Sequence, residues 1–236
     1  MRRLVLLPQV ACIFLLMLNT GCHRKIGEPD DSQELMRPQD VLAFDRLYHQ
    51  NCSACHGESG RDGPALDLSN PEYQALVDDA SLKHWIIAGM AGTQMPAFGE
   101  SAGGFLTDKQ VDALVEGMRK NWRIAQPQQD THMPPYTANV TGDIARGSQV
   151  YRTACLSCHE RQQQITDTAF LALTSGQALR TIIIAGRPDL GQPDWQSKTA
   201  GHALSNQDVT DVVAYLGSLR SVTPGQPYTD RENVQR

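Results

Sequence analysis

The sequence predicts an all-α protein made of two tandem helical domains of similar design. The first observation is a duplication: the pattern C-x-x-C-H occurs at 52–56 and at 155–159, each time with a tyrosine four residues before the first cysteine. The second is that similar segments follow both copies in the same order, which is typical of a duplicated domain. The third is the recurrence of apolar residues at helical spacing. The 236 residues are enough for two domains of roughly 100 residues each.

Residues 1–21 are expected to be an export signal rather than part of the fold. Arg2 and Arg3 precede a short apolar stretch, 10–18, and this order is typical of a secretory signal peptide. The stretch is too short to cross a bilayer as a stable anchor. No later run is apolar enough to span a membrane, so we expect any membrane attachment to be through a lipid.

Cys22 is the candidate site for that lipid. Small residues lead into it, which resembles a bacterial lipobox, where the signal is cut and the cysteine thiol is acylated. One position departs from the pattern, because Asn19 stands where an aliphatic residue is usual. We expect residues 22–36 to form a flexible tether on the periplasmic side of a bacterial membrane. A soluble periplasmic protein is the alternative if Cys22 is not lipidated.

The first domain is expected over residues 37–123 and is bounded by helices. Apolar residues recur at helical spacing in 38–50, which continues into the first C-x-x-C-H motif. Thr107 and Gln110 resemble a capping pair at the start of the closing helix. The residues that follow give this helix an apolar face, which we expect in the core: Val111, Leu114, Val115 and Met118.

A linker is expected at 124–141, because this stretch is rich in proline and glutamine and lacks apolar periodicity. The second domain, 142–221, repeats the order of the first and leaves a C-terminal tail, 222–236. Its closing helix has the same design, with Ser205 and Asp208 as the capping pair. The apolar row that follows consists of Val209, Val212, Val213 and Leu216.

The two C-x-x-C-H motifs carry the strongest chemical signal in the chain. In this pattern two thiols one helical turn apart add across the two vinyl groups of a haem, and the adjacent histidine binds the iron. Two covalently bound haems c would also supply the apolar core that such short helices lack. The candidate residues are Cys52, Cys55 and His56 for one haem, and Cys155, Cys158 and His159 for the other.

Other interpretations of these four cysteines fit less well. Disulfides are usual in exported proteins, but a C-x-x-C redox pair belongs in a βαβ context, which this sequence lacks. A zinc site needs a fourth ligand, and two cysteines and a histidine within five positions are crowded around one tetrahedral ion. Chance is excluded because the motif is duplicated with similar flanks.

With these motifs, the chain resembles the dihaem members of the class I cytochrome c family over roughly residues 37–123 and 142–221. The family has a first helix, C-x-x-C-H, a distal loop with Met-Pro, and a last helix that packs on the first. The first domain has every part, and the resemblance implies that Met95 is the distal iron ligand. Met90 is a nearby competitor that lacks the following proline. Histidine with methionine raises the haem potential and leaves no open position, which suits an electron carrier.

The second domain departs from this pattern at the distal ligand. Its loop at 191–195 reads GQPDW, so Gln192 stands in the position of Met95. No methionine follows Met133 in the chain. Four possibilities stay open: His202 as the distal ligand, Gln192 as a weak or water-mediated ligand, an open sixth position, or Met133 or His132 reaching across from the linker.

The resemblance implies an exported electron carrier between a respiratory or photosynthetic quinol-oxidising complex or a dehydrogenase and a terminal acceptor. The alternative is a haem enzyme or ligand sensor with an open distal site at the second haem, although no further cluster of acid and base residues points to catalysis. We expect redox proteins as partners. Nucleic acid is not expected, because the net charge is −5 and no basic run is present.

Overall fold

The computed structural model describes residues 36–122, 132–160 and 165–220. Within these ranges the chain forms α-helices, short 3-10 helices and loops, with no β-strand, so the predicted all-α class is confirmed. None of the helices in this part of the chain has the length and hydropathy that a membrane span requires. The expected signal peptide, Cys22 and the expected C-terminal tail lie outside the described residues.

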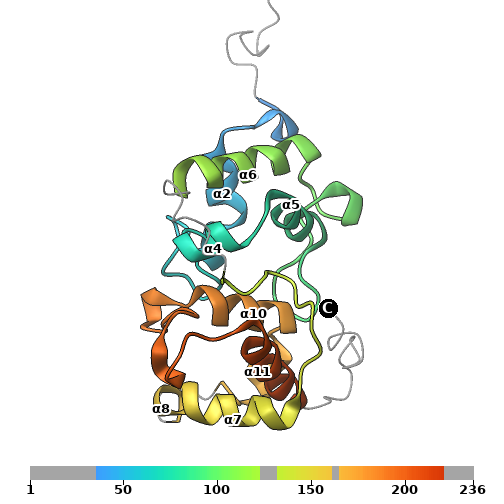
Figure 1. Ribbon diagram of the computed structural model, residues 1–236. Coiled ribbons are helices and arrows are strands. Elements are labelled where there is room, and N and C mark those ends of the chain that lie inside the picture. The colour runs from blue at the N-terminus through green and yellow to red at the C-terminus, as the bar shows by residue number, and fades with distance from the viewer. Residues whose placement is uncertain (1–35, 123–131, 161–164, 221–236) are drawn as a thin grey trace, which may run out of the picture. The chain divides into compact units, whose positions relative to one another are not determined.

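The first repeat, residues 39–122, holds five α-helices, coloured blue to green in Figure 1. They are α2 (Phe44–Asn51), α3 (Ser53–His56), α4 (Pro71–Leu76), α5 (Asp79–Ala88) and α6 (Asp108–Trp122), with 3-10 turns at Pro38–Asp40 and Glu100–Ala102. The helix expected over 38–50 begins only at Phe44. The reason is that Val41 is buried and its carbonyl accepts a hydrogen bond from Gln110 on α6 (3.1 Å), which holds this stretch out of helical geometry.

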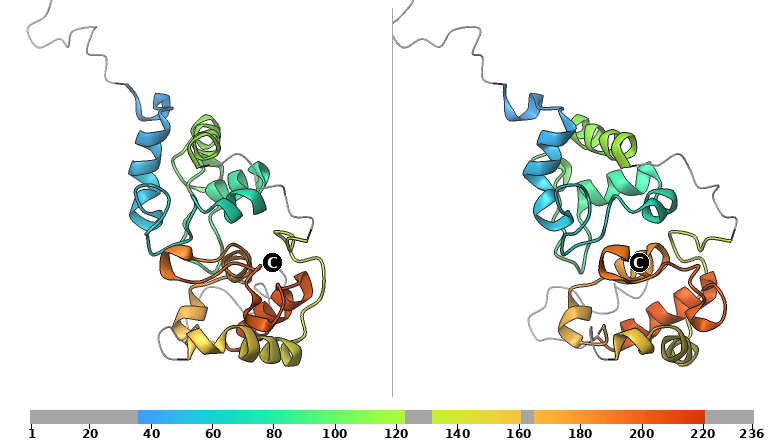
Figure 2. Two further views of the ribbon diagram at one scale, coloured as in Figure 1. Left: turned by 60° about the vertical axis from the view of Figure 1, so that its left-hand side comes forward. Right: turned by 90° about the vertical axis from the view of Figure 1, so that its left-hand side faces the viewer.

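The second repeat, residues 142–220, contains the corresponding helices, coloured yellow to red in Figure 1. Its described helices are α7 (Ile144–Ala154), α8 (Leu156–His159), α9 (Thr168–Ala172), α10 (Gly176–Ala185) and α11 (Asn206–Ser218), with 3-10 turns at Pro188–Leu190 and Lys198–Ala200. In each repeat the last helix packs on the first, α6 on α2 and α11 on α7. Figure 2 shows that both pairs cross rather than run parallel.

The sequence features assigned to the closing helices are confirmed. Thr107 and Gln110 exchange reciprocal hydrogen bonds at the start of α6, and Ser205 and Asp208 form a complete capping box on α11. On α6 the expected core residues are at most 3% exposed: Val111, Leu114, Val115 and Met118. On α11 the residues that are at most 1% exposed are Val209, Val212 and Leu216, whereas Val213 is half-buried.

The described residues from Gln39 onwards belong to one compact unit that contains both repeats. Ala185 at the end of α10 packs with the core of the first repeat. Leu76 of α4 packs against a core cluster of the second repeat. Helix α4 contacts α10, so the two repeats share an apolar boundary.

The part of the expected linker that the structure describes, 132–141, is docked on the second repeat. Arg180 of α10 is 2% exposed and donates to the carbonyls of Pro135 (2.7 and 2.9 Å) and Tyr136 (3.1 Å). It also donates to the hydroxyl of Thr210 on α11 at 3.0 Å. Burial lowers the pKa of Arg180 to about 10. The segment is therefore held by a buried cation through neutral acceptors.

Candidate haem-binding sites

The first C-x-x-C-H motif lies where α2 ends and α3 begins. The amide of Cys52 donates to Tyr48 at 2.8 Å, and the amides of Cys55 and His56 both donate to the Cys52 carbonyl, at 3.1 and 3.0 Å. This turn sets the cysteines and the histidine on one short helical segment. Both cysteines are free. Burial raises the pKa of Cys52 to about 12.

His56 is fixed by the carbonyl of Leu66. Its Nδ1 lies 2.7 Å from that oxygen. Because a carbonyl oxygen only accepts hydrogen bonds, Nδ1 carries the proton and Nε2 keeps its lone pair. Burial lowers the pKa of His56, the Leu66 hydrogen bond opposes this change, and the charge of Arg187 lowers the pKa further. A neutral imidazole with a fixed ring and an unprotonated Nε2 is the form that binds iron.

The loop after the first motif folds tightly against it. The hydroxyl of Tyr48 donates to the Gly57 carbonyl at 2.7 Å, and the amide of Ala65 donates to the Cys55 carbonyl at 2.9 Å. Gly57 has φ +77°, and a Cβ there would lie 1.7 Å from the Arg61 carbonyl oxygen, so only glycine fits. These contacts hold the loop in the place that presents Leu66 to His56.

The second motif has the same backbone turn. Cys155 follows the last residue of α7, and its amide donates to Tyr151 at 2.9 Å. The amides of Cys158 and His159 donate to the Cys155 carbonyl at 3.2 and 3.0 Å. Both cysteines are free, and burial raises the pKa of Cys155 to about 11. Both motifs therefore present their residues in the same local conformation.

A glycine closes the distal loop in both repeats. Gly89 has φ +69° and Gly186 has φ +73°, values that glycine adopts without strain. A Cβ on Gly89 would lie 2.6–2.8 Å from the backbone of residues 95–97. A Cβ on Gly186 would lie 2.8–2.9 Å from the backbone of residues 192–194. The two loops therefore pass equally close to the helix that precedes each of them.

Backbone hydrogen bonds across these loops match as well. The amide of Met90 donates to the Met95 carbonyl at 3.1 Å, and the amide of Arg187 donates to the Gln192 carbonyl at 2.9 Å. The structure thus places Gln192 where the first repeat has Met95. Its side-chain amide nitrogen donates to the carbonyl of Ile182 on α10 at 3.1 Å. In the second repeat the side-chain amide of Gln192 is therefore hydrogen-bonded to the last part of α10.

Trp195 supplies a test of whether the second repeat fits a haem. The side chain is 3% exposed, and its Nε1 has no hydrogen-bond partner among the residues that the structure describes. It belongs to an apolar cluster against which Cys155 packs. A buried N–H without an acceptor costs free energy, and a haem carries two propionate groups that accept hydrogen bonds. The residues around the second motif therefore fit the group that the motif implies.

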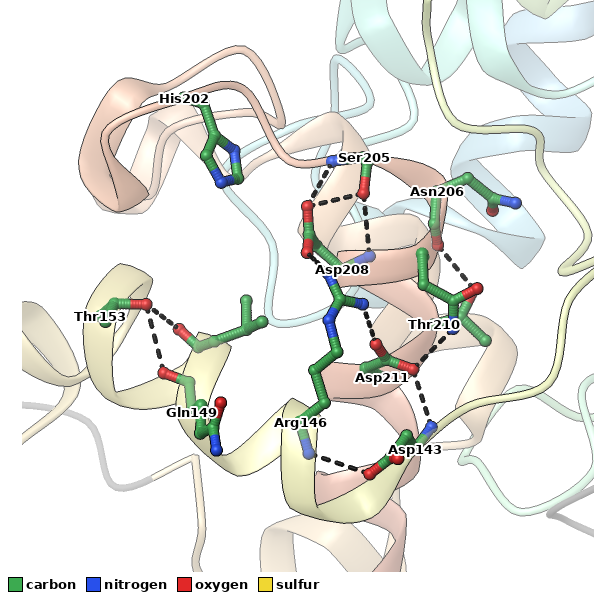
Figure 3. Close-up of polar contacts among 12 residues, drawn as sticks. Asp143, Arg146, Gln149, Thr153, His202, Ser205, Asn206, Asp208, Thr210 and Asp211 are labelled. Carbon is green, nitrogen blue, oxygen red and sulfur yellow. Dashed lines mark hydrogen bonds and ion pairs between the residues drawn. The ribbon is translucent and has the colours of Figure 1, made fainter.

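The other candidates for the second distal position are placed as follows. His202 is exposed on the loop before α11, with Nδ1 at 2.8 Å from the Ala203 carbonyl, and Figure 3 shows it in the neighbourhood of Asp208. His132 is exposed, whereas Met133 packs against the cluster that contains Trp195. The ligation of iron by any of these residues stays a prediction.

Two contributions to the sites could not be inferred from the sequence. The acceptor for His56 is a backbone carbonyl, which leaves no mark on residue type. Arg187 of the second repeat donates to the carbonyl of Gly63 in the first repeat at 2.9 Å, although the two residues are 124 positions apart. The only hint in the sequence was that Arg187 directly follows the loop glycine, at the position where the first repeat has Met90.

Comparisons with known proteins agree with this arrangement. Residues 39–116 and 142–216 match the family described as cytochrome C oxidase, cbb3-type, subunit III. The chain is 26% identical over 186 residues to the Cbb3-type cytochrome c oxidase subunit CcoP of Azospirillum sp. (strain B510), covering 69% of this chain and 51% of that protein. It is 29% identical over 143 residues to the dihydro-heme d1 dehydrogenase of Pseudomonas aeruginosa, covering 60% of this chain and 26% of that protein.

The chain thus spans about half the length of the first relative and about a quarter of the second. The family match covers more than half of the chain, and each of its two regions contains one C-x-x-C-H motif at a helix end. The predicted tandem arrangement of cytochrome c domains is therefore confirmed. The chain belongs to the family of cbb3-type cytochrome c oxidase subunit III and is an electron-transfer cytochrome of the c type, the class that carries covalently bound haem.

Proposed function

We propose that the chain is an exported dihaem electron carrier with two chemically different haems. The observation that carries this proposal is the duplicated turn of the C-x-x-C-H motif, with His56 oriented by Leu66 in the first copy. The first haem is assigned to Cys52, Cys55, His56 and Met95. The second is assigned to Cys155, Cys158 and His159.

Each haem, when bound, supplies a one-electron iron couple. The chain's own residues would hold the porphyrin through thioethers and keep the imidazole of His56 neutral and correctly turned through Leu66. Met95 would close the sixth position of the first haem and favour a high potential, as a soft thioether does. Transfer to a partner then needs no bond to be made or broken.

The proposed partners are redox proteins on the periplasmic side of the membrane. The donor would be a quinol-oxidising complex or a dehydrogenase. A respiratory oxidase complex is the favoured acceptor, because the relative from Azospirillum is a subunit of a cbb3-type oxidase. We propose a signal peptide and a lipid on Cys22 as the means of export and attachment, on the sequence pattern alone.

A second candidate function concerns the second haem. The amide nitrogen of Gln192 is engaged by the carbonyl of Ile182, and His202 lies on an exposed loop. These placements favour a sixth position that an external ligand could occupy, which would suit a ligand sensor or a haem enzyme.

The proposal is tested by counting haems and by redox titration of the purified full chain, followed by low-temperature EPR. We expect two covalent haems per chain with different potentials. Met95→Ala should lower the potential of the first haem and open its sixth position. Gln192→Met should raise the potential of the second haem, because the two loops share one backbone geometry.

A chain without covalent haem would contradict the proposal as a whole. Full haem loading with an unchanged spectrum in Met95→Ala would contradict the assignment of Met95. Stoichiometric binding of carbon monoxide to one reduced haem, together with peroxide turnover, would favour the second candidate function over the carrier.

A further inference from the structure

The distal loop of the second repeat reaches into the first repeat. Arg187 is only 6% exposed, and one of its guanidinium nitrogens donates to the carbonyl of Gly63 at 2.9 Å. The root of the loop is fixed nearby, because the side chain of Asn70 donates to the Ala185 carbonyl at 2.8 Å. Arg187 and Gln192 are also joined by two backbone hydrogen bonds of 2.9 Å each. The backbone that carries Arg187 is therefore fixed, and its guanidinium meets a backbone acceptor in the first repeat.

Gly63 lies directly against the first haem motif. A Cβ at this position would be 2.3 Å from the Cys55 carbonyl oxygen and 2.8 Å from the carbonyl carbon of His56. A residue whose backbone is this close transmits its position to the motif, since no side chain intervenes. Arg187, a residue of the second repeat, thus contacts backbone that packs against the proximal histidine of the first repeat.

Arg187 is accompanied by a buried counter-charge. Asp189 accepts two hydrogen bonds from the guanidinium, at 2.9 and 2.6 Å, and the side chains are 7% and 4% exposed. Between the two members of the pair, only the arginine contacts the Gly63 carbonyl. A buried ion pair is weak support for stability by itself.

We propose that Arg187 sets the potential of the first haem through its charge. The loop in which glutamine has replaced the iron-binding methionine instead delivers a buried positive charge to the proximal side of the other repeat. A fixed positive charge near a haem disfavours the ferric state, because oxidation adds a positive charge to the iron. Arg187 therefore raises the potential of the first haem, and Asp189 moderates the effect. This inference rests on the proposed attachment of a haem to Cys52, Cys55 and His56.

The test measures the potential of each haem in the full, haem-loaded chain by redox titration with EPR. Arg187→Met should shift the first haem to a lower potential and leave the second nearly unchanged. Asp189→Asn should shift the first haem to a higher potential. Arg187→Lys, which keeps the charge, should restore most of the wild-type value. These opposite signs separate an electrostatic role from a structural one, which would move all variants in the same direction.

Arg61→Met is the matched control. It removes the same charge from the loop after the first motif, but the Arg61 side chain is 63% exposed and its field is screened by water. No shift in potential is expected. An equal shift in Arg61→Met and Arg187→Met would overturn the inference, as would shifts of the same sign in Arg187→Met and Asp189→Asn.

Arg187→Met leaves the Asp189 carboxylate buried without its partner, which can reduce folding. The double variant Arg187→Met/Asp189→Asn avoids this, and its first-haem potential should lie between those of the two single variants. A value outside that interval would contradict the proposal. Failure of the wild-type chain to bind a haem at the first motif would instead contradict the proposed function, and haem counting distinguishes the two results.

Discussion

The first and last helices of the two repeats cross at the same place with different side chains. In the first repeat Phe44 of α2 lies against Gly117 of α6, where a Cβ would come within 2.1 Å of the ring. The corresponding residues of the second repeat are Gly147 on α7 and Tyr215 on α11, and a Cβ on Gly147 would lie 2.9 Å from the Tyr215 Cβ. The glycine and the aromatic residue have exchanged helices. The first and last helices therefore pack closely in both repeats, and the glycine that permits this can lie on either helix.

The surroundings of the two crossings differ in chemistry. In the first repeat the ring of Trp122 lies 5.5 Å from that of Phe44 and 5.0 Å from that of Tyr48. In the second repeat Arg146 of α7 forms ion pairs with Asp208 (2.5 Å) and Asp211 on α11, as Figure 3 shows. The second crossing thus adds a charged contact to its own aromatic pair, Tyr151 and Tyr215 (ring centroids 5.5 Å apart), whereas the contacts described at the first crossing are aromatic. The two repeats should therefore respond differently to mutation and to pH.

The largest effect is expected for Gly147→Ala. The added Cβ would lie 1.9 Å from the Asp211 carbonyl oxygen, which belongs to the helix backbone and cannot move alone. We expect a loss of about 3 kcal/mol in the free energy of unfolding, as for severe overpacking. Gly117→Ala should cost less, about 1.5 kcal/mol, because the added Cβ meets side-chain atoms of Phe44 (2.1–2.6 Å) rather than the backbone of α2. Denaturant unfolding of the haem-loaded chain measures both, and equal losses would contradict the comparison.

Arg146→Met should have the next largest effect. The change leaves Asp211, which is 0% exposed, and Asp208 without their cation. The Arg146 side chain is 45% exposed, so water screens part of the interaction, and we expect a loss of about 2 kcal/mol. The control is Arg152→Met on the same helix, whose guanidinium donates to the Ser148 hydroxyl at 2.7 Å in a solvent-exposed hydrogen bond. A comparable loss in the control would show that the ion pair contributes little.

Acidification should destabilise the second crossing more than the first. Burial tends to raise the pKa of Asp208, but hydrogen bonds from Ser205 and the charge of Arg146 lower it overall. A carboxyl with a lowered pKa stabilises the fold above its ordinary value of about 4 and loses this contribution as pH falls through the value in the folded protein. Unfolding midpoints measured from pH 6 to pH 3 should therefore fall less in Asp208→Asn than in wild type. Identical pH profiles would refute this assignment.

The smallest effect is expected for Lys83→Met. Lys83 occupies the position in the first repeat that corresponds to buried Arg180 in the second, but its side chain is 43% exposed. It pairs at 2.5 Å with Asp112, which is 59% exposed. Exposed pairs contribute little because water screens them. Thermal unfolding should show no measurable change in the midpoint. A clear loss of stability would mean that exposed Lys83 contributes to the fold much as buried Arg180 does.

The sequence predicted those parts of the fold that local patterns encode. The apolar rows of α6 and α11 and their capping pairs follow from residue type and spacing, and both were identified correctly. The correspondence of Gln192 with Met95 could be read from the duplication, since a repeated loop keeps its glycine and proline. The start of α2 was missed because Val41 is held by Gln110, a contact between residues 69 positions apart.

The candidate sites were predicted in their covalent part only. Cysteine and histidine spacing identifies the motif, whereas the orientation of His56 depends on a carbonyl that any residue could provide. The same holds for Arg187, whose acceptor is the backbone of Gly63 in the other repeat. Such contacts depend on how the repeats pack, and no single-sequence pattern records that packing.

Arg180 of α10 donates to the carbonyls of Pro135 and Tyr136. This contact determines where the polypeptide can be divided. A recombinant second half that starts at Gly142, where the duplication begins, would lack both carbonyl acceptors and leave the buried Arg180 with fewer partners, among them Thr210 and Asn206. A half that starts at His132 would retain the carbonyl acceptors. The segment that evolution copied and the segment that an engineer can excise are therefore not the same length of chain.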